Sequence, residues 1–353
     1  MSALCRHFGT CGGCTFQDMP PEAYLRMKRE QVGRALAAHG LGEVTVDLPA
    51  EVLPRTRRRA SLKAAKHDGE TKIGFHAARS HRIVDMRECR VLLPALADLI
   101  SPLRDVLTLL LRDDEEAELL LTETDEGADI GFRFPRAPDA RRVSALALWA
   151  GKQRVARISV NGETAFQFGT PSVRLGRAQV GLPSGSFLQP TREGEQFLQA
   201  AVCDGTKGAS RIVDLFAGCG TLALALASRA RVHAVDSDAD GLAALFAAAQ
   251  RTQKLKPVTV ETRDLFKRPF SVKEIEGFEA AVLDPPRAGA MSQAKELAAS
   301  GLVSIVYVSC NPESFARDAA ILSGGGFRIG RVQPVDQFLW SSHIELVAFL
   351  SRH

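Results

Sequence analysis

The sequence predicts an α/β protein of 353 residues, with a doubly wound, Rossmann-like sheet in its C-terminal half and a β-rich N-terminal half. Three observations support this prediction. After Pro190, apolar runs alternate with Ala- and Leu-rich helical stretches, as in a parallel sheet covered by helices on both faces. Before Pro190, short β-type runs are bounded by Gly, Pro and Asp clusters. A glycine-rich turn follows the first apolar run of the second half, where such sheets bind ligands.

The N-terminal half should contain more strands than helices. Alternating or β-branched runs predict strands over residues 119–124, 130–134, 155–160 and 173–180, and apolar residues at helical spacing predict helices over residues 24–38 and 93–111. In the C-terminal half, continuous apolar runs predict strands over residues 212–216, 232–235, 258–262, 280–283 and 302–309, with helices over residues 221–229 and 241–251. We therefore expect three parts: residues 1–92, a cysteine-containing loop and a basic segment; residues 93–190, a β-rich domain continuous with it; and residues 191–353, the Rossmann-like domain.

Composition excludes several classes of protein. The chain is 45% hydrophobic and 24% charged, which is an ordinary globular balance and argues against disorder and coiled coil. Charged residues interrupt every run long enough to cross a membrane, and the first residues lack the pattern of a signal peptide. We therefore expect a cytoplasmic protein with no membrane partner, in which the seven cysteines serve metal binding or catalysis before disulfides.

Positive charge is concentrated in one segment. Residues 51–92 carry eleven Lys and Arg residues against five acidic residues, whereas residues 113–129 carry nine acidic residues and no Lys or Arg. The first segment would attract phosphate groups, and the second should lie away from them. From charge alone, a nucleic-acid-binding face and an ordinary solvated basic face fit equally well.

The glycine-rich turn has the features of a nucleotide-type cofactor site. It reads Asp214-Leu-Phe-Ala-Gly-Cys-Gly-Thr221, and Gly218 and Gly220 would let a ligand approach the backbone closely. The next predicted strand ends at Asp236, whose carboxylate could accept hydrogen bonds from ribose hydroxyls. Because no phosphate-binding loop and no third glycine are present, nucleoside triphosphatases and dehydrogenases are disfavoured. S-adenosylmethionine is the cofactor that fits best.

Two later strands end in reactive groups. Asp284-Pro-Pro-Arg287 follows one predicted strand, and Ser309-Cys310-Asn-Pro312 follows the next. Because strand carboxyl ends share one edge of a doubly wound sheet, we expect Asp284 and Cys310 to face the same cavity as the glycine-rich turn. Cys310 is then a candidate nucleophile, and a buried, inert thiol is the alternative interpretation.

Four motifs resemble those of the RNA uracil-5-methyltransferase family. They are Asp-Leu-Phe-x-Gly-x-Gly-Thr, Asp-Pro-Pro-Arg-Ala-Gly, Tyr307-Val-Ser-Cys-Asn-Pro-Glu-Ser-Phe-Ala-Arg-Asp318 and Asp336-Gln-Phe-x-x-x-Ser-His-Ile-Glu345, and they span residue 186 to the C-terminus. The resemblance implies that Cys310 adds to C6 of a uracil and that Glu345 is the base that removes the C5 proton. It also implies a cofactor site lined by Gln189, Phe216, Thr221, Asp236, Asp264 and Asp284, next to Gly218. The chain departs from the family at Phe187-Leu-Gln-Pro-Thr191, commonly Phe-Phe-Gln-x-Asn, and at Ala217, where Cys is frequent, and both differences concern cofactor packing.

Four cysteines in the N-terminal part are candidate ligands of a metal ion or cluster. Cys5, Cys11 and Cys14 lie close together and Cys89 lies far along the chain. From spacing alone they could hold zinc or an iron–sulfur cluster, or act as a redox dithiol. The resemblance implies a [4Fe-4S] cluster, since a branch of the family that acts on ribosomal RNA carries such a set. Many members also have an OB-type domain before the cysteines, for which residues 1–4 leave no room.

These observations together predict an S-adenosylmethionine-dependent enzyme that makes 5-methyluridine in RNA. The resemblance and the cysteines favour 23S ribosomal RNA as substrate, bound through residues 55–66 and the cluster region, with no obligate protein partner evident. The same chemistry on transfer RNA is one alternative. A non-catalytic iron–sulfur RNA-binding protein is the alternative from another class.

Overall fold

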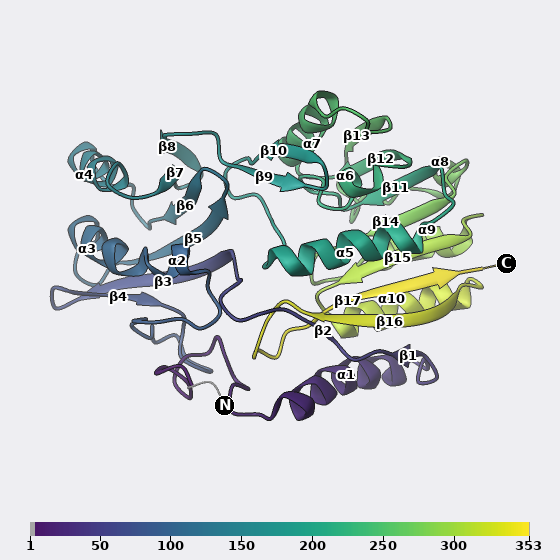
Figure 1. The fold of residues 1–353 in the computed structure, drawn as a ribbon, viewed down its shortest axis with the longest axis horizontal. Helices are drawn as coiled ribbons and strands as arrows, with labels where there is room; N and C mark the ends of the chain where they lie inside the picture. The colour runs from purple at the N-terminus through teal and green to yellow at the C-terminus, as the bar shows by residue number, and fades with distance from the viewer. Residues whose placement is uncertain (1–3, 353) are drawn as a thin grey trace.

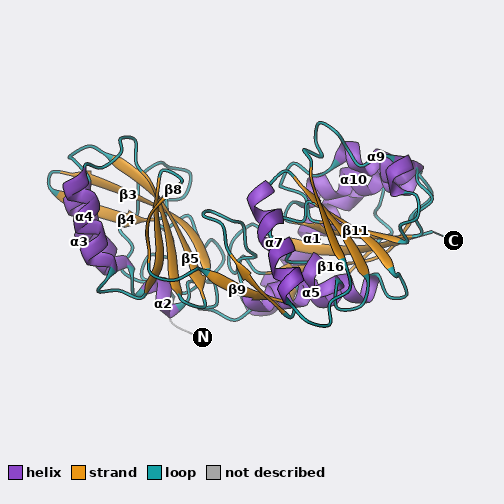
Figure 2. Cartoon of the chain, turned by 90° about the horizontal axis from the view of Figure 1, so that it is seen from above, coloured by secondary structure: helices purple, strands orange, loops and turns teal. Residues whose placement is uncertain are grey.

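The computed structural model describes residues 4–352, which form two lobes, each built on one sheet (Figures 1 and 2). A six-stranded sheet forms the first lobe and a nine-stranded sheet the second. Between them lies a small hairpin of strands β9 (Ser172–Leu175) and β10 (Ala178–Gly181). No helix within the described residues is long and apolar enough to cross a membrane.

The first lobe is a mixed sheet with helices packed on it. Its strands lie in the order β4-β3-β5-β6-β7-β8. They are β3 (Arg59–His67), β4 (Glu70–Gly74), β5 (Glu116–Thr124), β6 (Gly127–Arg133), β7 (Val155–Val160) and β8 (Glu163–Gln167), with helices α2 (Pro94–Ala97), α3 (Ile100–Leu110) and α4 (Ala140–Ala150). All neighbours are antiparallel except β6 and β7, because α4 supplies the crossover that a parallel pair needs.

The second lobe confirms the predicted α/β architecture. Its strands lie in the order β1-β16-β17-β15-β14-β11-β12-β13, and β2 also pairs with β16. They are β1 (Thr45–Val46), β2 (Ala50–Glu51), β11 (Arg211–Leu215), β12 (Arg231–Asp236), β13 (Val258–Thr262), β14 (Ala280–Leu283), β15 (Ser304–Ser309), β16 (Arg328–Asp336) and β17 (Glu345–Ser351). The helices are α5 (Arg192–Gly205), α6 (Ala223–Leu226), α7 (Ala239–Arg251), α8 (Val272–Ile275), α9 (Met291–Ala299) and α10 (Pro312–Gly324).

The expectation of a purely parallel sheet was wrong at one strand. β17 runs antiparallel to both β15 and β16, so the sheet is mixed. β17 follows β16 after the short segment 337–344, and antiparallel neighbours can be joined by such a short connection, whereas parallel ones need a crossover. The sheet is still doubly wound, because the five strands predicted for this half form its parallel part.

Three predicted elements also differ in detail. The strand predicted over residues 173–180 is a hairpin that turns at Gly176, whose φ of 57° favours glycine. The helix predicted over residues 93–111 is two helices, and that predicted over residues 221–229 shrinks to the four residues of α6. In each case the apolar pattern continued across a change of backbone direction, so periodicity alone did not reveal the break.

The first ninety residues contribute to both lobes. Helix α1 (Pro21–Ala38) packs against α10 and buries Val32 and Leu36 in the core of the second lobe, while β3 and β4 belong to the first. Lys28 on α1 lies 3.0 Å from the carboxylate of Asp336 at the end of β16, and both side chains are fully buried. The Tyr24 hydroxyl donates to the other carboxylate oxygen at 2.6 Å, so α1 fixes the end of β16.

We predict that Lys28→Met destabilises the second lobe strongly, by about 3–5 kcal/mol, because it leaves the Asp336 carboxyl buried without its cation. Urea unfolding followed by Trp340 fluorescence in a Trp149→Phe background would measure it. Arg26→Met on the same helix removes an exposed ion pair with Glu22 and should cost less than about 1 kcal/mol. Equal effects of the two substitutions would contradict this role for the buried pair.

Candidate functional site

The carboxyl ends of the parallel strands open into one cavity of about 420 Å³. It lies where the strand order reverses between β11 and β14, the place at which doubly wound sheets bind ligands. Most of the residues singled out from the sequence line it: Gln189, Phe216, Gly218, Thr221, Asp236, Asp284, Cys310 and Glu345. The structure therefore brings together eight positions that are spread over 157 residues of sequence.

The glycine-rich turn leaves space beside the cavity. A Cβ atom at Gly218 would meet nothing within 4 Å, whereas one at Gly220 would lie 2.5 Å from Leu245 of α7. Gly218 is thus free to face a ligand, and Gly220 is required for packing of the turn on α7. Phe216 has a φ of 66°, which is unusual for a residue with a side chain, and its ring lies 5.5 Å from that of Phe266. Phe266 also lines the cavity and was not anticipated from the sequence.

Two aspartates, Asp236 and Asp214, line the end of the cavity next to the glycine-rich turn. The Asp236 carboxylate accepts from the backbone N–H groups of Gly218 and Asp238, each at 2.8 Å, which ties the glycine-rich turn to the end of β12. Asp214 is fully buried, and neither of its carboxylate oxygens has a hydrogen-bond partner among the described residues. Burial, followed by the charges of Asp284 and Asp236, raises the pKa of Asp214 well above its usual range. Its place at the start of the glycine-rich motif was the signal that could have identified it.

A chain of amides joins two further carboxyl groups. Gln189 donates to Asp284 at 3.0 Å and accepts from Gln337 at 2.7 Å, and Gln337 also donates to Glu345 at 3.0 Å. Desolvation raises the pKa of Asp284 to about 7, against the Gln189 hydrogen bond that lowers it. Desolvation and the charge of Asp284 raise the pKa of Glu345 well above its usual range. Gln337 was not anticipated, although it lies inside a quoted motif.

Cys310 directly follows Ser309, the last residue of β15, and Ser309 pairs with Leu346 of β17. Continuing this antiparallel register by one residue sets Cys310 opposite Glu345. Burial, followed by the charges of Glu345 and Asp284, raises the pKa of the Cys310 thiol to about 11, while Arg287 lowers it. In this state the sulfur is therefore a thiol, and a neighbouring positive charge would favour the thiolate.

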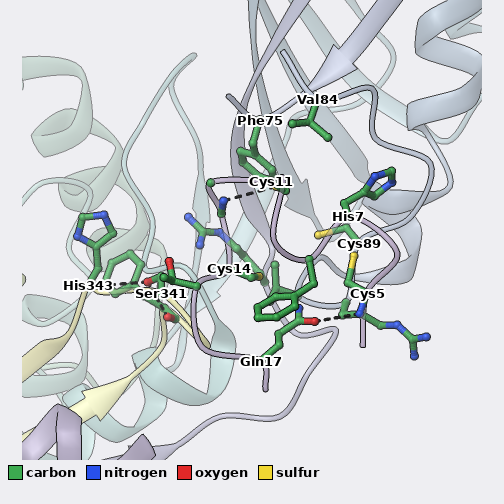
Figure 3. A pocket seen from close by; sticks show the side chains of 18 of the residues that line it. Cys5, His7, Cys11, Cys14, Gln17, Phe75, Val84, Cys89, Ser341 and His343 are labelled. Atoms are coloured by element: carbon green, nitrogen blue, oxygen red, sulfur yellow. Dashed lines mark hydrogen bonds between the residues drawn. The ribbon is translucent and has the colours of Figure 1, made fainter. Parts of the chain in front are cut away.

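A second cavity of about 390 Å³ adjoins the first and shares Cys310 and Arg287 with it. Figure 3 shows this second cavity. Cys5, Cys11, Cys14 and Cys89 line one side, and Ser341 and His343 line the other. Arg57 lies over the ring of Phe338, 5.7 Å from its centroid, and both residues line the wall. A molecule in either cavity can thus reach the Cys310 sulfur.

The four N-terminal cysteines lie around this second cavity and do not converge on a point. Within residues 4–352 no three His, Cys, Asp or Glu side chains are arranged to hold a single metal ion. Burial is the first cause that raises the pKa of all four thiols, and it brings the pKa of Cys14 to about 12. The charge of Cys89 raises the pKa of both Cys5 and Cys14, which reflects how close these thiols lie.

Two residues lie elsewhere than the sequence analysis predicted: Asp264, expected in the cofactor site, and Arg58, expected on the RNA-binding surface. Asp264 is not among the residues that line the first cavity. Its carboxylate accepts from the N–H groups of Phe266 and Lys267 and forms an ion pair with Lys267 at 3.1 Å, which is the role of a turn aspartate. Arg58, in the expected RNA-binding segment, is 1% exposed and pairs with Glu195. Its Nε donates to the carbonyl of Gln189 at 3.1 Å, so it supports the site from behind and does not face solvent.

Comparison with known proteins is consistent with this geometry. A model of the tRNA (uracil-5-)-methyltransferase family matches residues 175–353, just over half of the chain. The chain belongs to this family. An RNA methyltransferase of Rhizobium meliloti is 41% identical over 99% of this chain and 85% of its own length. The 23S rRNA (uracil(1939)-C(5))-methyltransferase RlmD of Halomonas elongata is 33% identical over 98% of this chain and 76% of its own length.

A solved structure is similar over nearly the whole chain. The tRNA (uracil-54, C5)-methyltransferase of Pyrococcus abyssi, in complex with S-adenosyl-L-homocysteine, has a TM-score of 0.76 and 26% identity, covering 99% of this chain and 87% of its own. The protein is therefore an S-adenosylmethionine-dependent RNA uracil-5-methyltransferase, and its substrate is RNA. The predicted enzyme class is confirmed, and so is S-adenosylmethionine as a cofactor; the comparisons do not show the predicted [4Fe-4S] cluster.

We predict that S-adenosylmethionine binds more tightly as the pH rises from 6 to 8, by about tenfold for one linked proton. Asp284, with a pKa raised to about 7, is mostly protonated at pH 6, and a cationic ligand favours its ionised form. Calorimetric titration of wild type and Asp284→Asn would measure this, with S-adenosylhomocysteine, which lacks the sulfonium charge, as the control ligand. An unchanged pH dependence in Asp284→Asn would exclude Asp284 as the linked group.

Proposed function

We propose that this enzyme methylates C5 of a uridine in 23S ribosomal RNA, with Cys310 as nucleophile and Glu345 as base. The observation that carries the proposal is the position of Cys310, which lines both cavities and shares the first with Glu345. Gln189, Phe216, Gly218, Thr221, Asp236 and Asp284 would hold the methyl donor in the first cavity. Asp264 is left out of this set because it lies outside the lining.

The chemistry requires two groups on this chain. The Cys310 sulfur adds to C6 of the uracil, and the electron pair of the C5–C6 bond becomes available at C5. S-adenosylmethionine would supply the methyl group: C5 would form a bond to the methyl carbon as the bond from that carbon to the sulfonium sulfur breaks, which leaves S-adenosylhomocysteine. Glu345 then takes the C5 proton, the C5–C6 double bond forms again, and the C6–S bond breaks to release Cys310 as a thiolate.

The electrostatics of the site favour this order of events. Glu345 and Asp284 raise the pKa of Cys310, so the thiolate is disfavoured while both carboxylates lack a cation. A sulfonium in the adjoining cavity supplies that positive charge, and Arg287 already lowers the pKa of Cys310. Formation of the nucleophile would thus depend on the methyl donor being bound.

The proposal for the RNA substrate rests on two similar proteins whose names give different RNA substrates. The similarity to RlmD, which extends over 98% of the chain, supports 23S ribosomal RNA. The structural similarity to an enzyme named for uracil 54 of tRNA supports transfer RNA as the second candidate. The alternative of a non-catalytic RNA-binding protein is set aside, because the family and its named relatives are methyltransferases.

We also propose that Cys5, Cys11, Cys14 and Cys89 hold a [4Fe-4S] cluster. The donor set fits: four thiols surround a cavity, and the Gly13 N–H points at the Cys11 sulfur at 3.4 Å. A cubane cluster needs ligands spread around it, whereas a zinc ion needs them converging on one point. The cluster would fix residues 5–17 against the segment around Cys89, and the methyl transfer itself requires no electron. Under the proposed division of the chain, residues 1–92 would supply this cluster and RNA contacts.

The cluster proposal predicts that anaerobic incubation with ferrous iron and sulfide loads about four iron atoms per chain. Cys89→Ser should lower the iron and sulfide content sharply and abolish the visible absorption. Cys203→Ser, a half-buried cysteine that does not line the cavity, should leave both unchanged. About one zinc ion per chain with the same cysteine dependence would replace the cluster by a zinc site.

The proposed reaction predicts incorporation of labelled methyl from S-adenosylmethionine into unmodified 23S ribosomal RNA, recovered as 5-methyluridine. Cys310→Ala should abolish it while leaving cofactor binding nearly intact. Glu345→Gln should accumulate an RNA–protein adduct that resists denaturation, because addition and methyl transfer precede the proton removal that it blocks.

Each outcome of this assay has a separate meaning. Label only in transfer RNA would keep the mechanism and replace the substrate. Normal turnover by Cys310→Ala would remove Cys310 as the nucleophile, and rapid product release by Glu345→Gln would remove Glu345 as the base. The Cys203→Ala variant is the matched control, since Cys203 lines neither cavity and has no proposed chemical role.

A further inference from the structure

We propose that Gln337 is a positioning residue that keeps Glu345 in its proton-accepting form during the elimination step. The inference rests on the proposed function, because it assigns a role that acts through Glu345. Gln337 follows β16 directly, is 1% exposed, and lies between Gln189 and Glu345. It does not line either cavity, so its influence on the reaction passes through its two neighbours.

The orientation of the Gln337 amide is fixed by what surrounds it. Its Nε2 group donates to Gln189 Oε1 at 2.7 Å and to Glu345 Oε2 at 3.0 Å. Gln189 in turn uses its own Nε2 to donate to Asp284. Turning the Gln337 amide over would set its oxygen against the Gln189 oxygen and the Glu345 carboxylate, which repel it. The chain of amides therefore offers an N–H to each carboxyl group, and both N–H groups stabilise the ionised forms.

On the opposite side of the amide, the oxygen is buried and has no hydrogen-bond partner among the described residues, so its orientation there depends on the helix end that it faces. The Gln337 Oε1 atom lies against Gly194 in the first turn of α5, where a Cβ atom would come within 2.5 Å of it. The amino end of this 14-residue helix carries partial positive charge and favours an oxygen over an N–H group. Gly194 is thus the residue that leaves room for Gln337. Lys28 and Tyr24 hold the carboxylate of the preceding residue, Asp336, and this fixes the backbone position of Gln337.

The groups that face Glu345 explain why such support is needed. Asp284 approaches from the end of β14 and Cys310 from the end of β15, with Arg287 beside Cys310. Burial and the Asp284 carboxylate raise the pKa of Glu345, and the Gln337 hydrogen bond is the interaction that lowers it. A base must be ionised to remove the C5 proton, whereas addition and methyl transfer do not require it. Loss of Gln337 should therefore slow elimination selectively.

The test compares Gln337→Met, which keeps the volume but removes the donor, with Gln337→Glu, which replaces the donor by a third carboxyl group. With ribosomal RNA as substrate, Gln337→Met should lower steady-state turnover by about tenfold while single-turnover methyl transfer changes less than about twofold. The denaturation-resistant RNA–protein adduct should accumulate. The acid limb of the turnover–pH profile should move upward by about one pH unit, so that raising the pH restores activity. Gln337→Glu should show the larger shift.

Controls separate this role from a structural one. Gln333→Met changes a half-buried glutamine on β16, four residues before Gln337, whose side chain donates to the Leu48 carbonyl, and it should leave the pH profile and the adduct unchanged. A loss of activity that no pH restores, with no adduct, would overturn the inference, as would a wild-type profile in Gln337→Met. If Gln337→Met does not fold, Gln337→Glu, which keeps the shape, decides. Activity of Cys310→Ala would instead overturn the proposed function itself.

Discussion

The site depends on several carboxyl groups that the fold places close together and that have no Lys or Arg side chain as an ion-pair partner. Elsewhere the buried carboxylates are paired: Asp336 with Lys28, Glu195 with Arg58, and Asp129 with Arg157. Among the described residues Asp214, Asp284 and Glu345 have no such partner, and burial, followed by the charge of neighbouring carboxylates, raises the pKa of each. Ionising an unpaired buried carboxyl group is unfavourable, and a positively charged ligand in the cavity would favour the ionised forms. The sulfonium of the methyl donor meets that requirement.

The N-terminal loop is the second element on which the site relies, because it contacts both lobes. On one side, Gly12 donates to the His76 carbonyl at 2.9 Å in the first lobe. On the other, the N–H groups of Thr15 and Phe16 donate to the Trp340 carbonyl at 2.6 and 3.1 Å, in the segment that connects Asp336 to Glu345. Trp340 has a φ of 59°, and its own N–H donates to the Tyr24 hydroxyl. The loop that carries three of the cysteines is thereby joined to the segment that carries Gln337 and leads to Glu345.

Sequence patterns predicted the central parallel strands well because a strand such as β14 is buried on both faces and reads as a continuous apolar run. The bounds of β14 and of the edge strand β13 are those expected. They also predicted which side chains share a cavity, since the carboxyl ends of neighbouring parallel strands meet at one edge. They failed where a role depends on contacts distant in sequence. Arg58 reads as part of a basic surface until Glu195, 137 residues away, is seen to pair with it. Gln337 is an ordinary strand-end glutamine until Gln189 and Glu345 are seen on either side.

The shared position of Cys310 restricts how RNA can approach. With the methyl donor in the first cavity, a uracil would reach the sulfur along the side of the second cavity that Phe338 and His343 line, opposite the cysteines that would hold the cluster. A base inside an RNA helix cannot enter such a space, so the uridine must be unstacked or already single-stranded. Several basic residues of the segment 51–92 are exposed and are then available to phosphates that flank the extruded nucleotide. They are Arg55, Lys72, Arg79, Arg82 and Arg87. Non-specific affinity and base selection would thus come from different parts of the molecule: the exposed arginines and lysine contact the backbone, and the walls of the second cavity select the base.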